Sequence, residues 1–300
     1  MMHSLSLAGL IEELAWRAQF PGLSACLALL LIVCPVSGES SEVSVESNVS
    51  YKSVTELGFA KADHKLIYGD ANPLLQYGLL WLPENLAANE KAPLVVFIHG
   101  GCWLNAYDII HSYALTSALA KSGFAVWSLE YRRTGDAGGA WPGSFDDIRQ
   151  GLAYSSRLGD YPLDLQRIVI MGHSAGGHLA LLAAADNQDI HAVIGLAAIS
   201  NIIEYSRGTN SCQTAALKFM DGPYEAKPAA YEAANPASRQ VHKNTILLQG
   251  NADSIVPLDQ SQLTGASTTV HEGAGHFDWL HPGTTAYQLL LSKLEDIFGD

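Results

Sequence analysis

Short apolar runs alternate with longer segments of helical periodicity from Tyr51 to the end of the sequence. The candidate strands, whose length and composition are typical of strands buried on both faces, are residues 94–99, 124–131, 167–172, 191–199 and 245–250. Segments with helical spacing follow them, at 109–121, 145–158, 175–185 and 284–298. Ser144 is the expected N-cap of the helix at 145–158, and Asp146 and Asp147 are expected to favour the positive end of its dipole. This order predicts an α/β domain with a mostly parallel central sheet and helices on both faces.

Three further segments complete the predicted domain. Residues 66–68 and 76–82 are typical of an edge hairpin, because the turn-forming residues Gly69, Asp70, Asn72 and Pro73 separate them. Residues 200–239 lose the regular alternation and gain glycine and proline, which predicts a small insertion over the strand ends that shapes a binding pocket. A helix near 257–263 and a strand at 268–271 precede the last helix.

The N-terminal region differs from the rest of the chain. Residues 23–36 are apolar and uncharged, yet too few to span a bilayer comfortably, and small residues follow at Ser37 and Gly38. We interpret residues 1–38 as a cleaved secretory signal and 39–300 as the mature domain, secreted or periplasmic and without stable membrane insertion. Glu12, Glu13 and the single Arg17 count against this reading. With these residues in front of the apolar run, the true start codon is an open question. The alternative to a signal is an amphipathic N-terminal helix on a cytoplasmic protein.

Charge and cysteine content restrict the partners and the chemistry. The formal net charge of −13 would repel a phosphate backbone, which excludes nucleic acid as an expected partner. Of the four cysteines, only Cys102 and Cys212 would remain after signal cleavage. Their spacing resembles no metal site, and whether they pair is open.

A glycine-flanked serine stands at one of the predicted strand-to-helix junctions. The segment Gly-His-Ser-Ala-Gly at 172–176 joins the strand at 167–172 to the helix at 175–185. A serine in such a turn is strained, with its hydroxyl exposed, and its neighbours leave no room for side chains. A phosphate-binding turn would call for a lysine or further glycines. Ser174 is therefore the candidate nucleophile.

A serine hydroxyl needs a base, and that base needs a third group to fix its tautomer. Of the 11 histidines, His276 lies in a glycine-rich segment directly after the last predicted strand, where a loop can carry the imidazole over the strand ends. His173 and His178 belong to the serine turn and its helix, and their side chains are expected to point elsewhere. His281 is the main rival.

Asp253 is the candidate acid, because it follows the strand at 245–250 and lies beside the histidine loop at the carboxyl edge. The chain order Ser174, Asp253, His276 is the one that this strand-turn-helix architecture requires. Asp259 and Asp278 are expected to be surface or capping carboxylates.

Acyl transfer also needs preorganised donors for a negative oxygen, and a glycine-rich loop offers backbone amides without side chains in the way. The segment His-Gly-Gly-Cys-Trp at 99–103 predicts such a loop. The candidate donors are the amides of Gly101, Cys102 and Ala175, and His99 is expected to brace the loop. Trp103 either contacts substrate or packs in the core.

Four segments together resemble the α/β-hydrolase superfamily, and they lie at 99–103, 130–133 (Glu-Tyr-Arg-Arg), 172–178 and 275–278 (Gly-His-Phe-Asp). Over 51–300 the chain is similar to the esterase/lipase branch, which includes bacterial feruloyl and acetylxylan esterases, hormone-sensitive-lipase-like enzymes and kynurenine formamidases. Cys102 departs from the third glycine of the lipase-like loop and is closer to the formamidases.

The resemblance implies an α/β-hydrolase fold and a serine esterase that cleaves small carboxylic esters, with short acyl or aryl groups, through an acyl-enzyme on Ser174. Neither a metal nor an organic cofactor is expected. An arylformamidase would use the same residues on a formamide, and an inactive hydrolase fold used for binding is a third reading. The acyl group, the alcohol group and the oligomeric state cannot be read from these residues.

Overall fold

The computed structural model describes residues 47–299, so the predicted signal at 1–38 lies outside the described residues. The described residues belong to the unit Ser44–Asp300, which is distinct from Met1–Val43. No helix among residues 47–299 combines the length and the apolar character needed to cross a membrane.

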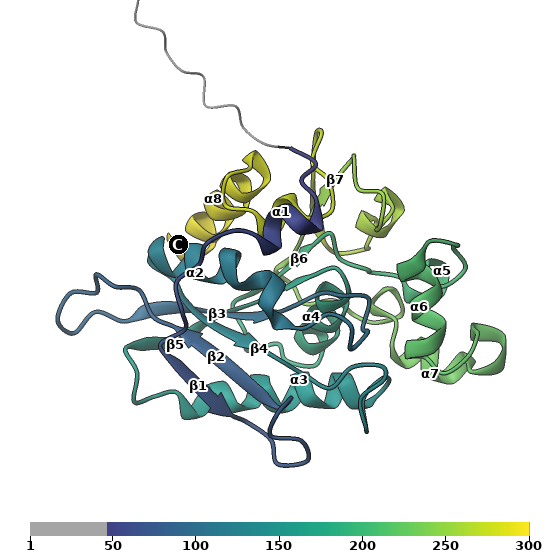
Figure 1. The fold of residues 1–300 in the computed structure, drawn as a ribbon, viewed down its shortest axis with the longest axis horizontal. Coiled ribbons are helices and arrows are strands. Elements are labelled where there is room, and N and C mark those ends of the chain that lie inside the picture. Colours follow the sequence, from purple (N-terminus) through teal and green to yellow (C-terminus); the bar gives the residue numbers. More distant parts are fainter. Residues whose placement is uncertain (1–46, 300) are drawn as a thin grey trace, which may run out of the picture. The chain divides into compact units, whose positions relative to one another are not determined.

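An eight-stranded sheet forms the centre of this unit, in the order β1-β2-β4-β3-β5-β6-β7-β8 (Figure 1). The strands are β1 (His64–Ile67), β2 (Tyr77–Trp81), β3 (Ala92–Ile98), β4 (Ala125–Leu129), β5 (Leu163–His173), β6 (Ala192–Leu196), β7 (Thr245–Gly250) and β8 (Ser267–His271). β1 pairs with β2, and β2 with β4, in antiparallel fashion, whereas every pairing from β4 through β3 to β8 is parallel. The predicted parallel sheet with an edge hairpin is confirmed.

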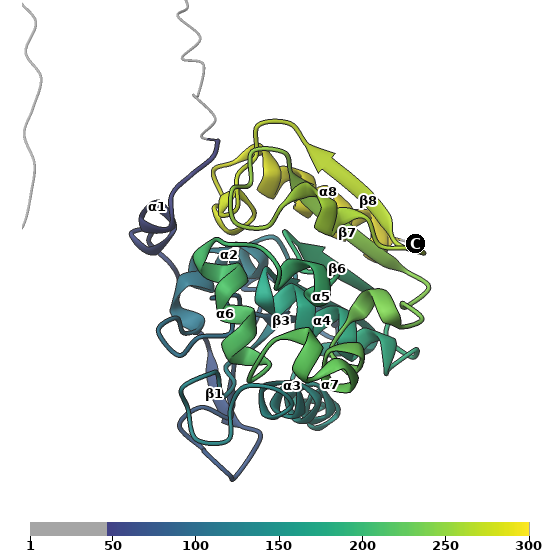
Figure 2. The ribbon, with the colours of Figure 1, turned by 90° about the vertical axis from the view of Figure 1, so that its right-hand side faces the viewer.

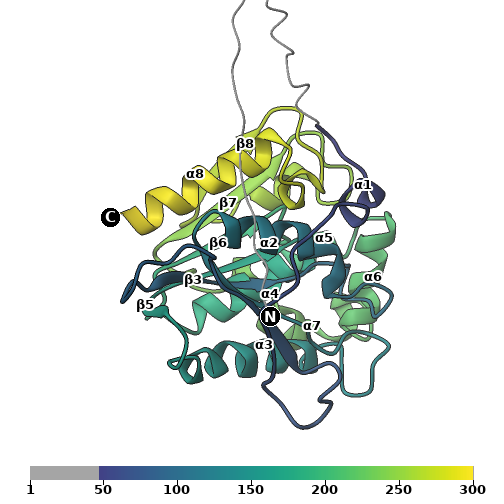
Figure 3. The ribbon, with the colours of Figure 1, turned by 60° about the vertical axis from the view of Figure 1, so that its left-hand side comes forward.

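The buried strands divide their side chains between two apolar clusters, one on each face. In β3, Val95 and Phe97 join one cluster, while Leu94, Val96 and Ile98 join the other, as the alternation of a strand requires. α2 (Tyr113–Lys121) and α8 (Thr285–Gly299) cover the first face, and α3 (Gly143–Tyr154) and α4 (Ala175–Ala185) cover the second. Figures 2 and 3 show α8 and α3 on opposite sides of the sheet.

The insertion predicted at 200–239 is a small helical group, which is drawn in green in Figure 1. It contains α5 (Ile202–Tyr205), α6 (Ser211–Phe219) and α7 (Pro228–Ala233). α6 begins with a capping box in which the side chains of Asn210 and Gln213 each accept a hydrogen bond from the other's backbone amide. The side chains of Cys212, Ala216 and Phe219 on α6 pack into the same apolar cluster as α3 and α4.

Three helix predictions need correction. Ser144, expected as the N-cap of the third helix, lies inside α3, and its hydroxyl donates to the backbone carbonyl of Arg132 at 2.6 Å. The side chain of Asp147, expected to favour the positive end of the helix dipole, is instead buried and accepts a bidentate hydrogen bond from Arg132. The helix expected near 257–263 is a short 3₁₀ turn, Leu258–Ser261.

Candidate active site

Ser174 occupies the sharp turn between β5 and α4. Its φ of 56° lies in the left-handed region, which a residue other than glycine adopts only under strain. A side chain at Gly172 would place its Cβ 2.2 Å from the carbonyl oxygen of Gly176, and one at Gly176 would meet the carbonyl oxygen of Ile98 at 2.2 Å. The glycines are therefore required by close backbone contacts. The hydroxyl of Ser174 has no hydrogen-bond partner among residues 47–299.

Asp253 follows β7 in the chain, and several hydrogen-bond donors fix its carboxylate. Its Oδ1 accepts hydrogen bonds from the backbone amides of Ile255 and Val256, at 2.8 and 2.9 Å. Its Oδ2 accepts from Nδ1 of His276 at 2.7 Å and from the side-chain amide of Gln249 at 3.2 Å. Because Nδ1 of His276 carries the proton in this bond, Nε2 keeps a lone pair and is free to act as a base.

The loop that carries His276 is held by His173, the residue next to Ser174. Nε2 of His173 donates to the backbone carbonyl of His276 at 2.9 Å. Complete burial, together with the nearby His276, lowers the pKa of His173 well below its usual value, so the ring stays neutral. His173 lines the same cavity as Ser174, and sequence reasoning missed its contact with the histidine loop.

Asp278 is not the surface or capping carboxylate that was expected. Its side chain is 1 % exposed and accepts hydrogen bonds from the backbone amides of Asn48, Val49 and Gly275, at 2.7, 2.9 and 3.1 Å. It thereby ties the chain before α1 (Tyr51–Thr55) to the histidine loop. Asp259, by contrast, is exposed in the first turn of a 3₁₀ segment, in agreement with its prediction.

The rival histidines have other roles. Nδ1 of His281 accepts from the backbone amide of Gly283 at 3.1 Å, and this histidine does not line the cavity that contains Ser174. The ring of His178 is buried behind the serine turn, where Nε2 donates to the backbone carbonyl of Ala234 at 2.6 Å.

The loop predicted to supply oxyanion donors has an unusual backbone. Gly101 has a φ of 108°, and a side chain there would place its Cβ 2.5 Å from Cβ of Tyr107. Cys102 also has a positive φ, of 52°. Ala175 is the first residue of α4, and a helix's first amides have no acceptor within the helix. These three amides are the ones that sequence analysis selected.

Buried ionisable side chains support this loop from behind. Nε2 of His99 lies 3.1 Å from a carboxylate oxygen of Glu130, and the hydroxyl of Tyr131 donates to the backbone carbonyl of His99 at 3.0 Å. Burial opposes ionisation of Glu130, but His99, Arg133 and the amide of Tyr131 outweigh it and lower the pKa of the carboxyl group. The bracing role expected of His99 agrees with these contacts.

Trp103 packs in the core and does not line the cavity, so of the two readings of this residue the structure supports core packing. Its side chain is 0 % exposed, and its ring stacks on Phe219 of α6 with centroids 4.9 Å apart. Its indole nitrogen donates to Nδ1 of His178 at 3.3 Å. The aromatic ring has its polar group satisfied inside the core, which is the usual condition for burying tryptophan.

Cys102 and Cys212 form a disulfide across 110 residues of sequence. One end lies in the 99–103 loop and the other in the first turn of α6. The bridge therefore attaches the helical insertion to the candidate oxyanion loop. Both cysteines line the cavity beside Ser174.

The cavity at this site has a volume of about 280 Å³. Its lining brings Ser174 and His276 together with residues from distant parts of the sequence, namely Tyr51, Gly101, Cys102, Tyr107, His111, His173, Ser211, Cys212, Ile255 and Phe277. The aromatic residues in this lining could not be selected from sequence, because an isolated tyrosine in a loop carries no signal of its position in space.

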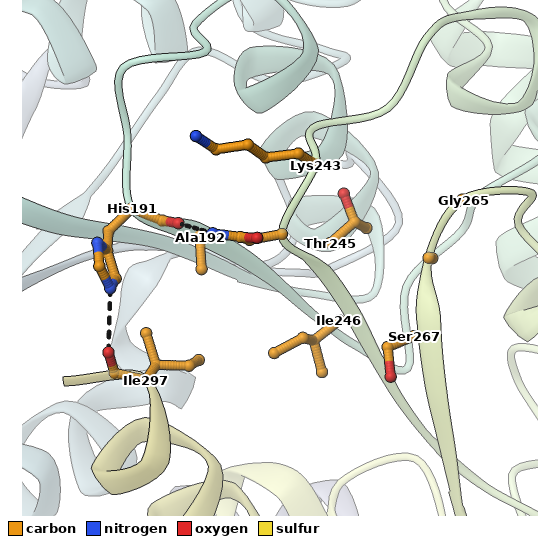
Figure 4. A pocket seen from close by; sticks show the side chains of 10 residues that line it. His191, Ala192, Lys243, Thr245, Ile246, Gly265, Ser267 and Ile297 are labelled. Atoms are coloured by element: carbon orange, nitrogen blue, oxygen red, sulfur yellow. Dashed lines mark hydrogen bonds between the residues drawn. The ribbon is translucent and has the colours of Figure 1, made fainter. Parts of the chain in front are cut away.

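A larger cavity of about 740 Å³ lies at the amino ends of β6 and β7, and its lining does not combine a nucleophile, a base and an acid as the Ser174 site does. Figure 4 shows the ring of His191 turned to the backbone carbonyl of Ile297, which Nε2 contacts at 3.0 Å. Lys243 supplies the charged side chain of this lining, and no serine there faces a histidine with a carboxylate partner. No group of metal-binding side chains occurs in the part of the chain from residue 47 to residue 299.

Solved structures with similar backbones identify the fold. Esterase B from Lactobacillus Rhamnosis (HN001) is 21% identical, with a TM-score of 0.68, over 83% of this chain and 90% of that one. A truncated carbohydrate esterase from gut microbiota is 20% identical, also with a TM-score of 0.68, over 81% of this chain and 100% of that one. At these identities the similarity shows the fold alone, which is the α/β-hydrolase fold.

Similarity in sequence agrees with this. Esterase LipQ of Mycobacterium tuberculosis is 25% identical over 206 residues, 63% of this chain and 48% of the relative. Esterase LipC of the same organism is 25% identical over 221 residues, 66% of this chain and 53% of the relative. The chain thus spans about half the length of these curated relatives. The BD-FAE family model matches residues 80–266, which is more than half of the chain, and the protein therefore belongs to the BD-FAE family.

Proposed function

We propose that this protein is a carboxylic ester hydrolase that acts through an acyl-enzyme on Ser174. The observation that carries the proposal is the 2.7 Å hydrogen bond between Asp253 and Nδ1 of His276, with His276 lining the same cavity as the strained Ser174. A nucleophile, a base with a fixed tautomer and an orienting carboxylate are the groups that acyl transfer requires.

In the first half of the reaction, Oγ of Ser174 attacks the ester carbonyl carbon while Nε2 of His276 takes the hydroxyl proton. The carbonyl oxygen becomes negative and accepts hydrogen bonds from the amides of Gly101, Cys102 and Ala175. The tetrahedral intermediate then expels the alcohol, to which His276 gives its proton. The acyl group stays on Ser174 as an ester.

In the second half, water takes the place of the alcohol. His276 removes a proton from the water, whose oxygen attacks the acyl carbon, and the bond to Oγ of Ser174 breaks. Ser174 recovers its proton from His276, and the carboxylic acid leaves. The charge on Asp253 stabilises the imidazolium form of His276 in both halves.

The site also supports a coarse choice of substrate. A cavity of about 280 Å³ with a largely aromatic and aliphatic lining favours a small ester with a short acyl or aryl group. The names of the relatives, esterases LipQ and LipC, and of the structural neighbours support an ester as the substrate.

We also propose that the protein works outside the cytoplasm, secreted or in a periplasm. The Cys102–Cys212 disulfide supports this location, because such bridges persist in oxidising compartments. The apolar run at 23–36 supports it independently, as a secretory signal.

Initial rates on p-nitrophenyl acetate, butyrate and octanoate and on N-formylkynurenine test the activity, with Ser174→Ala measured beside the unaltered protein. We expect hydrolysis of the short esters and its loss in the variant. Preference for N-formylkynurenine would move the assignment to a formamidase. Absence of turnover on every substrate, with no covalent labelling of Ser174, would favour a binding protein.

A further inference from the structure

One side of the candidate active-site cavity is an aromatic wall, formed by Tyr51, Tyr107, His111 and Phe277. The ring of Tyr51 lies at its centre, with centroid distances of 5.8 Å to Tyr107, 5.9 Å to His111 and 5.5 Å to Phe277. Tyr107 and Phe277 meet Tyr51 edge-on, a favourable arrangement for aromatic pairs. Tyr51 is 37 % exposed, so part of its ring is available to a ligand.

Tyr51 reaches this wall because the chain before it is fixed in place. The backbone amides of Asn48 and Val49 bind the buried carboxylate of Asp278, two residues beyond His276. Ser50 then caps α1, with its hydroxyl accepting from the amide of Ser53 at 3.0 Å. The first residue of α1 is Tyr51 itself, so the backbone bonds to Asp278 hold Tyr51 beside the loop that carries His276.

The chemistry of acyl transfer decides which half of an ester meets this wall. His276 gives its proton to the departing alcohol oxygen, so the alcohol must lie beside the imidazole of His276. Phe277 is the neighbour of that imidazole, with ring centroids 5.0 Å apart, and Tyr51 packs on Phe277. The rest of the lining, which includes the Cys102–Cys212 bridge and Ser211, is left for the acyl group.

His111 adds a mostly buried imidazole ring to the aromatic wall. The side chain is 3 % exposed, and Nδ1 has no hydrogen-bond partner within residues 47–299. Burial, followed by the neighbouring His99, lowers the pKa of His111 to about 3, so the ring is neutral at working pH. A neutral imidazole adds no positive charge to the wall, so the wall suits an uncharged ring better than an anion.

We propose that Tyr51 is a specificity-determining residue, and that with Phe277, Tyr107 and His111 it forms a subsite for a flat, uncharged aryl alcohol as the leaving group. This inference rests on the proposed esterase function. In the acylation step the bond between Ser174 Oγ and the acyl carbon forms, the bond from that carbon to the aryl oxygen breaks, and the proton from Ser174 passes through His276 to that oxygen.

A leaving-group subsite has a kinetic signature that an acyl subsite lacks. All acetate esters give the same acetyl-enzyme, whatever their alcohol, so deacylation cannot depend on Tyr51 contacts with a departed alcohol. Only acylation, reported by kcat/KM, can depend on them. An aromatic contact of ordinary strength corresponds to roughly three- to tenfold in that ratio.

The test compares phenyl acetate with ethyl acetate, which share an acyl group, and p-nitrophenyl acetate with p-nitrophenyl butyrate, which share an alcohol. We expect Tyr51→Ala to lower the phenyl-to-ethyl ratio of kcat/KM by about three- to tenfold, with the butyrate-to-acetate ratio and acetyl-enzyme hydrolysis unchanged. Tyr51→Phe keeps the ring and should keep the ratio. Phe59→Ala is the matched control, because Phe59 is a 45 % exposed aromatic that packs on Tyr113 and does not line the cavity.

Two results would overturn the proposal. A change in the butyrate-to-acetate ratio in Tyr51→Ala would place Tyr51 on the acyl side, and unchanged ratios in a variant with unaltered thermal unfolding would remove it from substrate contact. If Ser174→Ala hydrolyses these esters as fast as the unaltered protein does, the proposed function itself fails, and the subsite with it.

Discussion

His173 donates a hydrogen bond from Nε2 to the backbone carbonyl of His276, so the residue beside the nucleophile fixes the loop of the base. In His173→Phe this bond is lost while a ring of similar size stays. We expect kcat to fall about ten- to hundredfold with little change in KM, because a small displacement of His276 is costly to acyl transfer. Steady-state kinetics on p-nitrophenyl acetate measure this effect, and an unchanged kcat would show that the loop is positioned without His173.

The Cys102–Cys212 bridge should stabilise the folded protein strongly, because it closes a loop across 110 residues. A loop of this size corresponds to about 5 kcal/mol in the chain-entropy description of disulfides. Reduction should therefore lower the urea midpoint of unfolding. The double variant Cys102→Ser, Cys212→Ser is the control, and its midpoint should not respond to the reductant. If reduction leaves the urea midpoint of the unaltered protein unchanged, the disulfide does not have this stabilising role.

We expect the protein to lose stability in mild acid because of the buried His178. Nε2 donates to Ala234 and Nδ1 accepts from Trp103, and burial lowers the pKa of His178 to about 4. The unfolded chain therefore binds a proton that the folded chain refuses, so this contribution to stability is complete above pH 6.5 and falls as the pH drops toward 4.

Between pH 6.5 and pH 5 the loss from His178 is on the order of 2 kcal/mol. Urea unfolding at both pH values measures it. His178→Gln, which does not titrate at this position, should lose less stability over the same interval. His111 and His173, whose pKa values are lowered in the same direction, continue to contribute. Equal losses in the two proteins would argue against His178 as a source.

Asp278 should contribute to stability and also to the placement of the chain around α1. In Asp278→Asn, one of the two oxygens that accept the amides of Asn48, Val49 and Gly275 becomes a donor group. We expect a decrease of about 1–3 kcal/mol in the free energy of unfolding, because a buried amide loses its acceptor. The same change at the exposed Asp259 is the matched control and should cost little. Equal stability of both variants would refute the role of Asp278.

The sheet could be predicted because its residues carry a local signal. The run at 94–99 is apolar throughout, and in β3 it serves both faces, with Val95 on one and Val96 on the other. The glycines around Ser174 were predictable for a similar reason, because the close contacts of Gly172 and Gly176 belong to the turn itself and to the neighbouring strand.

Other features depend on contacts between distant segments, and the sequence does not reveal them. Serine is a common N-cap residue, but the hydroxyl of Ser144 donates a hydrogen bond to the nearby backbone carbonyl of Arg132 instead. Trp103 follows the candidate oxyanion loop, yet Phe219 from the insertion provides a stacking partner in the core. The position of Tyr51 depends on Asp278, more than two hundred residues away in sequence, because the carboxylate of Asp278 binds the backbone amides of Asn48 and Val49.

The most direct test of the central claim is mass spectrometry of the protein after reaction with a fluorophosphonate. We expect one adduct, on the peptide that contains Ser174, and none in Ser174→Ala. Asp253→Asn should react more slowly, because the 2.7 Å hydrogen bond between Nδ1 of His276 and the Asp253 carboxylate, which fixes the tautomer of His276, is lost. Labelling of another residue, or undiminished ester hydrolysis by Ser174→Ala, would contradict the assignment of Ser174 as the nucleophile.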